Sequence, residues 1–268
     1  MAEPARAALP QRFGRPTPVA FVGYVVGIAV VLWAANGAEW SFSELVTGLP
    51  ALADFLSRAW PPSLDRFHSL FRALVETFQM AIIGTLVGVI LSLPLAILGA
   101  RGLTGLRFLE WPARSIVALF RTVPDLVWAL VFVIAVGLGP FSGTLALAID
   151  TAGFCGRFFA EAMEDVDKGP ADSLRAQGVR RLDTIFCATI PAALPAFVTT
   201  SLFALEKATR SSVILGLVGA GGIGLELKVA MDLFDYQRAA TIILMIFVLV
   251  VAVEQAGGFV RARIMQDR

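Results

Sequence analysis

The sequence predicts an all-α integral membrane protein with about six transmembrane helices, and three observations support that prediction. Hydrophobic residues make up 57% of the 268 positions and charged residues only 16%, and the mean hydropathy is +0.77. Charges this sparse cannot cover the surface of a soluble globule of this length. The apolar residues also gather in long runs, several of them near the roughly 20 residues with which a helix crosses a bilayer.

The order of these runs divides the chain into five expected parts. They are an amino-terminal cytoplasmic tail, a first transmembrane helix, a periplasmic or interfacial segment, a transmembrane domain and a carboxyl-terminal tail, over residues 1–18, 19–35, 36–71, 72–264 and 265–268. Within the transmembrane domain, spans are expected over residues 74–100, 115–138, 144–159, 191–217 and 239–260.

Two of these segments keep an alternative interpretation. The first run ends in Ala34 and Ala35, small residues that also suit a signal-peptide cleavage site. A retained helix is favoured, because an export signal makes less sense before segments that are themselves spans. In residues 36–71, leucines at helical spacing favour an amphipathic helix in the outer interface, and a simple folded loop is the alternative.

The distribution of positive charge orients the spans. Fourteen Lys and Arg residues fall in the amino-terminal tail and in residues 101–114, 157–181 and 261–268, whereas seven fall on the opposite side. Cytoplasmic loops retain the excess of positive charge. Both termini and the polar segment are therefore expected in the cytoplasm.

The polar segment, residues 161–191, interrupts the hydrophobic runs and carries its own helix signals. Pro170 suits the first helical position, because its missing N–H is not needed there. Asp172 in the first turn is favoured by the helix dipole, and Gly178 can end the helix in a left-handed conformation. These signals predict a short helix with a glycine corner, and Pro191 marks the entry to the next span.

The sequence lacks the residues that several classes of function need. The formal net charge of +1 gives no electrostatic support for a nucleic-acid partner. Cys155, Cys187 and His68 are the only residues of their types, so we expect reduced packing cysteines and no metal site. No Gly-Lys dipeptide occurs, hence no phosphate-binding P-loop. The chain is not expected to be an enzyme, and any ATPase must be another chain.

Gly219, Gly221 and Gly224 spell the GxGxxG pattern of dinucleotide-binding folds. That mechanism needs a preceding strand, a following helix in a parallel sheet and an acidic residue about 20 positions later. Here the glycines follow a hydrophobic span instead. A tight turn that lets helices pack closely, with Gly222 inside it, is the favoured interpretation.

The polar segment resembles the cytoplasmic loop of ABC-importer permeases. That loop usually reads Glu-Ala-Ala, three residues, Gly, nine residues, Ile, one residue, Leu-Pro. Here the same frame reads Asp172-Ser173-Leu174, three residues, Gly178, nine residues, then Ala188-Thr189-Ile190-Pro191. The glycine, the spacing and the proline are kept, whereas aspartate replaces glutamate and both alanines differ.

A second motif, EKATRSSVILGLVGAGGIG over residues 206–224, is similar to the permease of phosphonate ABC importers, as are RTVPDLVWAL and GLGPFSGTLALAIDTAG. That family commonly shows Glu-x-Asn-x-Arg before Leu-Gly-x-x-Gly-x-Gly-Gly-Ile-Gly. The matching residues are Glu206, Arg210, Leu215, Gly216, Gly219, Gly221, Gly222, Ile223 and Gly224. Ala208 replaces the usual asparagine. The resemblance covers about residues 71–264.

The resemblance implies a type I ABC-importer permease fold in the cell membrane and import of phosphonate or a related phosphorus oxyanion. The implied partners are ATP-binding cassette ATPase subunits, an extracytoplasmic phosphonate-binding protein, a second permease chain (a copy or a paralogue) and membrane lipid. ATP and Mg would be used by the ATPase, and no cofactor is expected on this chain. Coupling to the ATPase is implied for Asp172, Ser173, Leu174, Arg175, Gly178 and Pro191.

Charged residues inside the spans allow two interpretations. Ionisable side chains in a membrane usually pair with each other or line a path. Arg210, and with it Arg121, would then offer a cation to an oxyanion in the translocation path, because a guanidinium matches its oxygens. Alternatively, Arg210 pairs with Glu206 and Arg121 with Asp125, one turn apart on the same helix, and these pairs only fix the packing.

Three alternatives to a phosphonate-type permease remain. A methionine-type importer permease is the nearest, within the same class. A secondary carrier that acts alone would show internal repeats, and none is evident between the two halves. A scaffold subunit that transports nothing would not need paired charges within its spans.

Overall fold

A computed structural model describes residues 17–266, which are almost entirely helical and contain no β-strand. They belong to two compact units, Met1–Leu56 and Ser57–Arg268, which are considered separately. The expected all-α class is confirmed within the described range. Most of the expected amino-terminal tail lies outside the described residues.

The first unit holds helix α1 (Pro18–Gly37) and most of helix α2 (Phe42–Ala59). Thr17 begins α1, because its hydroxyl oxygen accepts the N–H of Ala20 at 3.4 Å and Pro18 occupies the first turn. No residue of α1 is buried. In α2, Leu45, Leu49 and Leu52 recur at helical spacing and are each more than half exposed. The helix that was favoured for residues 36–71 is therefore present.

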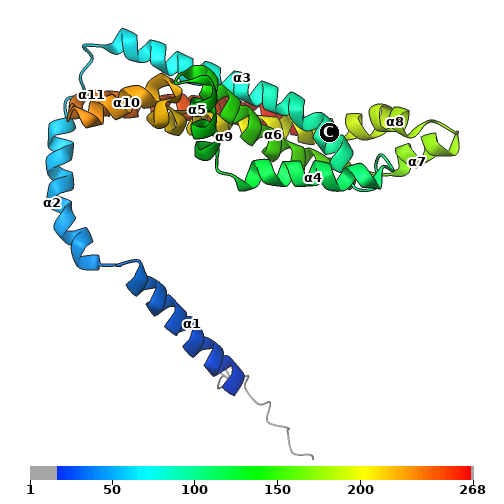
Figure 1. The fold of residues 1–268 in the computed structure, drawn as a ribbon, viewed down its shortest axis with the longest axis horizontal. Helices are drawn as coiled ribbons and strands as arrows, with labels where there is room; N and C mark the ends of the chain where they lie inside the picture. The colour runs from blue at the N-terminus through cyan, green and yellow to red at the C-terminus, as the bar shows by residue number, and fades with distance from the viewer. Residues whose placement is uncertain (1–16, 267–268) are drawn as a thin grey trace, which may run out of the picture. The chain divides into compact units, whose positions relative to one another are not determined.

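The second unit contains all the remaining helices, and Figure 1 shows them as an elongated bundle with α7 and α8 at one end and α10 at the other. In chain order they are α3 Phe67–Gly99, α4 Arg107–Thr122, α5 Asp125–Val136, α6 Pro140–Asp165, α7 Gly169–Ala176, α8 Arg181–Thr184, the π-helix η1 Ile185–Thr189, α9 Ile190–Leu215, the π-helix η2 Gly216–Ala220, α10 Gly222–Asp232 and α11 Tyr236–Gln266.

Helix α6 forms the centre of this bundle and packs against α3, α4, α5 and α9. Its closest neighbour is α3, which approaches along a row of small residues at four-residue intervals. At Gly88, a Cβ atom would lie 2.5 Å from Cβ of Thr151 and 2.7 Å from the carbonyl oxygen of Ala148. Small residues let helix backbones approach this closely in membranes. The row Gly84, Gly88, Ser92 and Ala96 is wholly buried.

Four helices among residues 17–266 are long and apolar enough to cross a membrane, and the bent pair α4 and α5 makes a fifth candidate. The four are α1, α3, the helical run Arg181–Ala220 and the part of α11 from Tyr236 to Ile264. Helix α6 is 26 residues long but too polar to qualify by composition. Because other helices enclose it, it has little need of an apolar surface towards lipid.

Two expected spans have different bounds in the structure. The expected span over residues 115–138 is broken, because α4 ends at Thr122 and α5 turns away by 92°. Pro124 explains this break: it has no N–H to donate and holds the preceding Val123 in an extended conformation, with ψ of 122°. The expected short span over 144–159 is only the middle part of the longer α6.

Pro191, the expected entry to the next span, lies within a continuous helix rather than at its start. The helix already begins at Arg181 in α8 and continues through η1 into α9. The π-helix accommodates the proline, because the N–H of Ile190 donates to the carbonyl of Ile185, five residues back. This continuity joins the polar segment directly to a membrane-spanning helix.

Candidate functional site

The short helix expected in the polar segment is present as α7. Pro170 lies in its first turn, and the hydroxyl of Ser173 donates to the Pro170 carbonyl at 2.8 Å. Gly178 follows with a φ of +83°, where its N–H donates to the carbonyl of Arg175 at 2.9 Å. The N–H of Val179 reaches back to Leu174 at 3.2 Å. This pair of bonds is typical of a glycine C-cap, so the expected glycine corner is confirmed.

The corner is open to its surroundings. Asp172 and Arg175 form an ion pair at 3.3 Å with side chains 64% and 40% exposed, so this pair contributes little to stability. Ser173 is exposed, and Leu174 is half-buried. A Cβ atom at Gly178 would meet nothing within 4 Å. Figure 1 shows α7 and α8 extending from the end of the bundle, so this surface is accessible to another molecule.

Two charged residues of α9 pair with residues of other helices rather than with one-turn neighbours. Lys207 Nζ lies 2.8 Å from both carboxylate oxygens of Asp150 on α6. Glu206 Oε1 lies 2.5 Å from Arg261 Nη1 on α11, and Arg261 also stacks 4.3 Å from the ring centre of Phe203. These partners lie 57 and 55 residues apart in the sequence, so local spacing could not identify them.

The two pairs that the sequence suggested are therefore absent. Glu206 is taken by Arg261, which leaves Arg210 exposed with no ion pair or hydrogen bond from its side chain within residues 17–266. Arg121 lies in the last turn of α4, whereas Asp125 begins α5 beyond the bend and accepts the N–H of Leu126 at 2.9 Å. An exposed guanidinium in a membrane-spanning helix needs a partner chain or a water-filled path beside it.

The glycine turn closes the far end of α9. Gly219, Gly221 and Gly222 all have positive φ, of +95°, +82° and +70°. The N–H of Gly222 donates to Glu76 Oε1 at 3.0 Å, and the N–H of Ile223 donates to Thr77 Oγ1 at 2.7 Å. Both acceptors belong to α3, so the turn is fixed to the bundle.

Gly224 allows α10 to return against the end of α9. A Cβ atom at Gly224 would lie 2.0 Å from the carbonyl oxygen of Val213 and 3.0 Å from Cα of Gly216. The GxGxxG pattern therefore joins two helices, with no strand before it. It is a packing turn, as the sequence favoured, and has none of the βαβ context that binds a dinucleotide.

The remaining candidate ligands are dispersed. Within the described residues, no three of the His, Cys, Asp and Glu side chains gather into a group that could hold a metal ion. Cys155 is buried, Cys187 is exposed, and neither forms a disulfide.

A helical membrane bundle from which one short helix is exposed defines the class of multi-pass integral membrane proteins. The chain belongs to the family described as binding-protein-dependent transport system inner membrane component, which matches residues 88–266. The matched range begins within α3 and includes the exposed corner and the glycine turn. The expected location in a cell membrane is therefore confirmed.

Two relatives of this chain are named as permeases for phosphorus compounds. The chain is 40% identical over 210 residues to the phosphate-import permease protein PhnE of Mycolicibacterium smegmatis. The aligned region covers 78% of this chain but only 40% of that protein. It is 36% identical over 219 residues to the phosphite transport system permease protein PtxC of Stutzerimonas stutzeri. That aligned region covers 82% of this chain and 80% of PtxC.

Solved structures agree on the fold. The structure is similar to one chain of the MetNI methionine ABC transporter in an inward-facing conformation, with a TM-score of 0.68 and 22% identity. The similarity covers 75% of this chain and 99% of that one. The expected type I ABC-importer permease fold is confirmed by this likeness.

Proposed function

We propose that this chain is the permease subunit of an ATP-driven importer that moves phosphonate, phosphite or phosphate into the cell. The observation that carries the proposal is its 36% identity to a phosphite permease over four-fifths of both chains. The proposal places both termini and α7 on the cytoplasmic side, as the excess of Lys and Arg there favours.

In this proposal, α7 is the contact with the ATPase. Its exposed residues Asp172, Ser173 and Arg175, with half-buried Leu174 beside them, would lie in a groove of the ATPase subunit, which binds ATP and Mg. The corner at Gly178 sets the direction in which α8 leaves that contact, and Pro191 lies in the helix that follows. A second permease chain and an extracytoplasmic binding protein complete the importer.

The cargo path in this proposal follows the exposed side of α9. Arg210 is the first candidate to meet the oxyanion, because its side chain is exposed and unpaired within the described residues, and its planar donors match phosphorus-bound oxygens. Lys207 lies one turn earlier, with its side chain 41% exposed. Glu206 faces α11 instead, where it holds Arg261, and supports the helix rather than the cargo.

Methionine import is the second candidate, since the chain is 27% identical over 206 residues to a probable D-methionine permease of Vibrio cholerae. The lower identity makes it the weaker candidate. An amino-acid cargo would also need an acceptor for its ammonium group, whereas the unpaired side chain on α9 is a cation.

Uptake in cells tests the proposed cargo. The chain is expressed with its ATPase and binding protein, and uptake of labelled phosphite, phosphate, methylphosphonate and methionine is compared. We expect uptake of at least one phosphorus oxyanion, its loss without the ATPase, and at least about a tenfold reduction in Arg210→Gln. The matched control Arg72→Gln removes an exposed arginine from the start of α3. Uptake of methionine alone would contradict the proposal.

Coupling is tested separately at the corner. Gly178→Trp adds bulk at an exposed position, so the chain should still insert, while substrate-stimulated ATPase activity of the assembled importer should be lost. Unchanged stimulation would contradict the assignment of α7 as the ATPase contact.

A further inference from the structure

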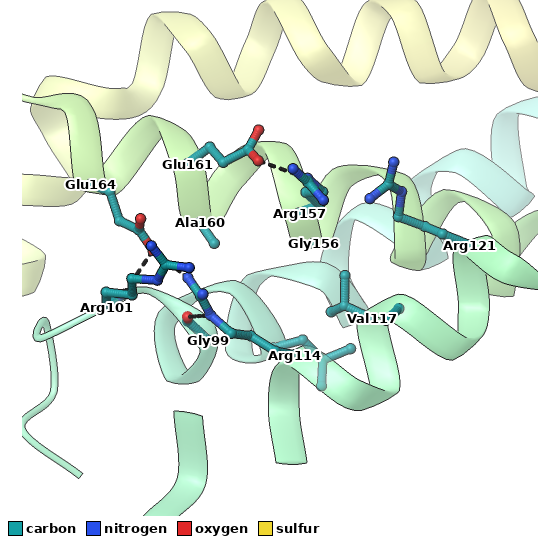
Figure 2. A pocket seen from close by; sticks show the side chains of 12 residues that line it. Gly99, Arg101, Arg114, Val117, Arg121, Gly156, Arg157, Ala160, Glu161 and Glu164 are labelled. Atoms are coloured by element: carbon teal, nitrogen blue, oxygen red, sulfur yellow. Dashed lines mark hydrogen bonds and ion pairs between the residues drawn. The ribbon is translucent and has the colours of Figure 1, made fainter. Parts of the chain in front are cut away.

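A cavity of about 420 Å³ lies between α4 and α6, beside the end of α3. Figure 2 shows the side chains that surround it, drawn from the two facing helices and from the loop after α3. Four of them are arginines, and two are glutamates. The arginines are Arg101, Arg114, Arg121 and Arg157, and the glutamates are Glu161 and Glu164.

The two carboxylates are already engaged. Glu161 Oε1 accepts from Arg157 Nε at 2.7 Å, and Glu164 Oε1 accepts from Arg114 Nη2 at 2.6 Å. Glu164 also accepts the backbone N–H of Arg101 at 2.8 Å. Neither the Arg101 nor the Arg121 side chain has an ion pair or hydrogen bond within residues 17–266. The cavity therefore carries an excess of two positive charges.

Close packing of α4 on α6 fixes where Arg121 lies. A Cβ atom at Gly153 would be 2.7 Å from Cβ of Phe120 and 3.1 Å from Cγ of Arg121. One turn on, a Cβ atom at Gly156 would be 3.1 Å from Val117. The two glycines thus let α4 pack closely on α6, and Gly153 leaves room for the stem of Arg121. Its charged end is left at the cavity, beside that of Arg157 (Figure 2).

We propose that this arginine cavity binds a phosphate group. Guanidinium groups bind phosphate through paired, charge-assisted hydrogen bonds, and two of the four here lack a partner within the described chain. The group could belong to an anionic phospholipid or to a free phosphorus oxyanion, because the recognition chemistry is the same. Basic pockets between membrane helices on the cytoplasmic side bind lipid head groups in this way.

Exposed apolar residues of α4 lie close to the cavity and suit contact with lipid. Trp111, one turn before Arg114, is 76% exposed, and Phe108 and Leu119 are 72% and 54% exposed. Apolar residues with an outward tryptophan are typical of helices at the edge of the hydrocarbon. Part of the cavity wall is apolar too, since Leu95, Val117 and Ala118 line it. A ligand with a phosphate group and an adjoining chain would suit both surfaces.

This site does not depend on the proposed cargo. It follows from the charges and walls of one cavity, and an importer of methionine with the same cavity would keep it. Its test is therefore a binding measurement without ATP and without transport, so that failure of the uptake experiment and failure of this one are distinguishable.

The experiment uses the full chain in its assembled importer, stripped of lipid in neutral detergent. Two probes are measured: inorganic phosphate by calorimetry, and phosphatidylglycerol against phosphatidylcholine by native mass spectrometry. We expect one probe to bind to the wild type and to bind at least about tenfold more weakly to Arg121→Gln. Ala118→Phe fills the cavity without removing charge and should give the same loss. Arg107→Gln, on the same helix but outside the cavity, should bind as the wild type does.

Each outcome either identifies the ligand of the cavity or overturns the proposal. Binding of inorganic phosphate that Arg121→Gln weakens identifies a free oxyanion as the ligand. Retention of phosphatidylglycerol over phosphatidylcholine, lost in both cavity variants and resistant to inorganic phosphate, identifies the lipid. Binding of neither probe, or equal binding by Arg121→Gln and Arg107→Gln, overturns the proposal.

Discussion

The two glycine corners of this molecule share a backbone conformation but differ in surroundings. Gly178 after α7 and Gly222 at the start of α10 have φ of +83° and +70°. Around Gly178 a side chain would find open space, whereas at Gly222 a Cβ atom would lie 2.3 Å from Thr77 Oγ1. Within this chain, the first glycine is needed only for its conformation, and the second also because nothing larger fits. The open corner is thus the one with room for a partner.

The largest effect is expected where the crowded turn is filled. Gly224→Ala would place Cβ 2.0 Å from the Val213 carbonyl oxygen, so α10 must move, and we expect destabilisation of about 3 kcal/mol or more. The measurement is the melting temperature and monodisperse yield in detergent. Gly258→Ala is the control, since its nearest neighbour is the Arg261 side chain at 3.9 Å. Equal melting temperatures and yields for the two variants would show that Gly224 is not too crowded for a side chain.

A smaller loss is expected where α3 holds the crowded turn. Thr77 Oγ1 accepts the N–H of buried Ile223 and donates to the Ala73 carbonyl. Thr77→Val leaves that N–H without a partner, which should reduce stability by about 1–3 kcal/mol. Thr122→Val is the matched control, because its hydroxyl bonds only to the carbonyl one turn back. Similar melting temperatures for both variants would show that the contact adds nothing.

The open corner should tolerate a side chain at the cost of its left-handed conformation alone. Gly178→Ala is expected to destabilise by about 1–2 kcal/mol, and Gly178→Asn by less, because asparagine enters this conformation more readily. The order Gly, Asn, Ala in melting temperature distinguishes backbone strain from crowding. A loss as large as that of Gly224→Ala would mean that the corner is packed.

The smallest effect is expected at the ion pair on α7. Asp172→Asn removes an exposed pair with Arg175, which is worth no more than about 0.5 kcal/mol. The melting temperature of the purified chain should be unchanged. A clear loss of stability would show that the pair supports the corner and that α7 is not merely a surface for a partner.

The comparison also shows what local sequence can reveal. Both corners were predicted from residues adjacent in the chain, because Pro170, Gly178 and the glycine run act through their own backbone. The expected span over residues 115–138 is instead broken at Pro124. The size of this bend depends on how α5 packs against α6, which the proline alone does not determine.

What the sequence missed depends on contacts between distant segments. Asp150 and Arg261 were not identified as partners of Lys207 and Glu206, because spacing along one helix reveals only neighbours one turn away. The cavity at Arg121 likewise combines three helices. The row of small residues on α3, from Gly84 onward, was the one visible signal of helix contact that local analysis left unused.

The unbroken run from α8 through η1 to α9 has a mechanical consequence. The run is helical from Arg181 to Leu215, before the non-helical Val218 and Gly219, and measures about 50 Å at roughly 1.5 Å per residue. Tilting a rod of that length by about 5° displaces one end by about 4 Å relative to the other. With the open corner at one end and Lys207 and Arg210 along its length, the run would act in the proposed importer as a lever that turns a push on α7 into motion of its charged face.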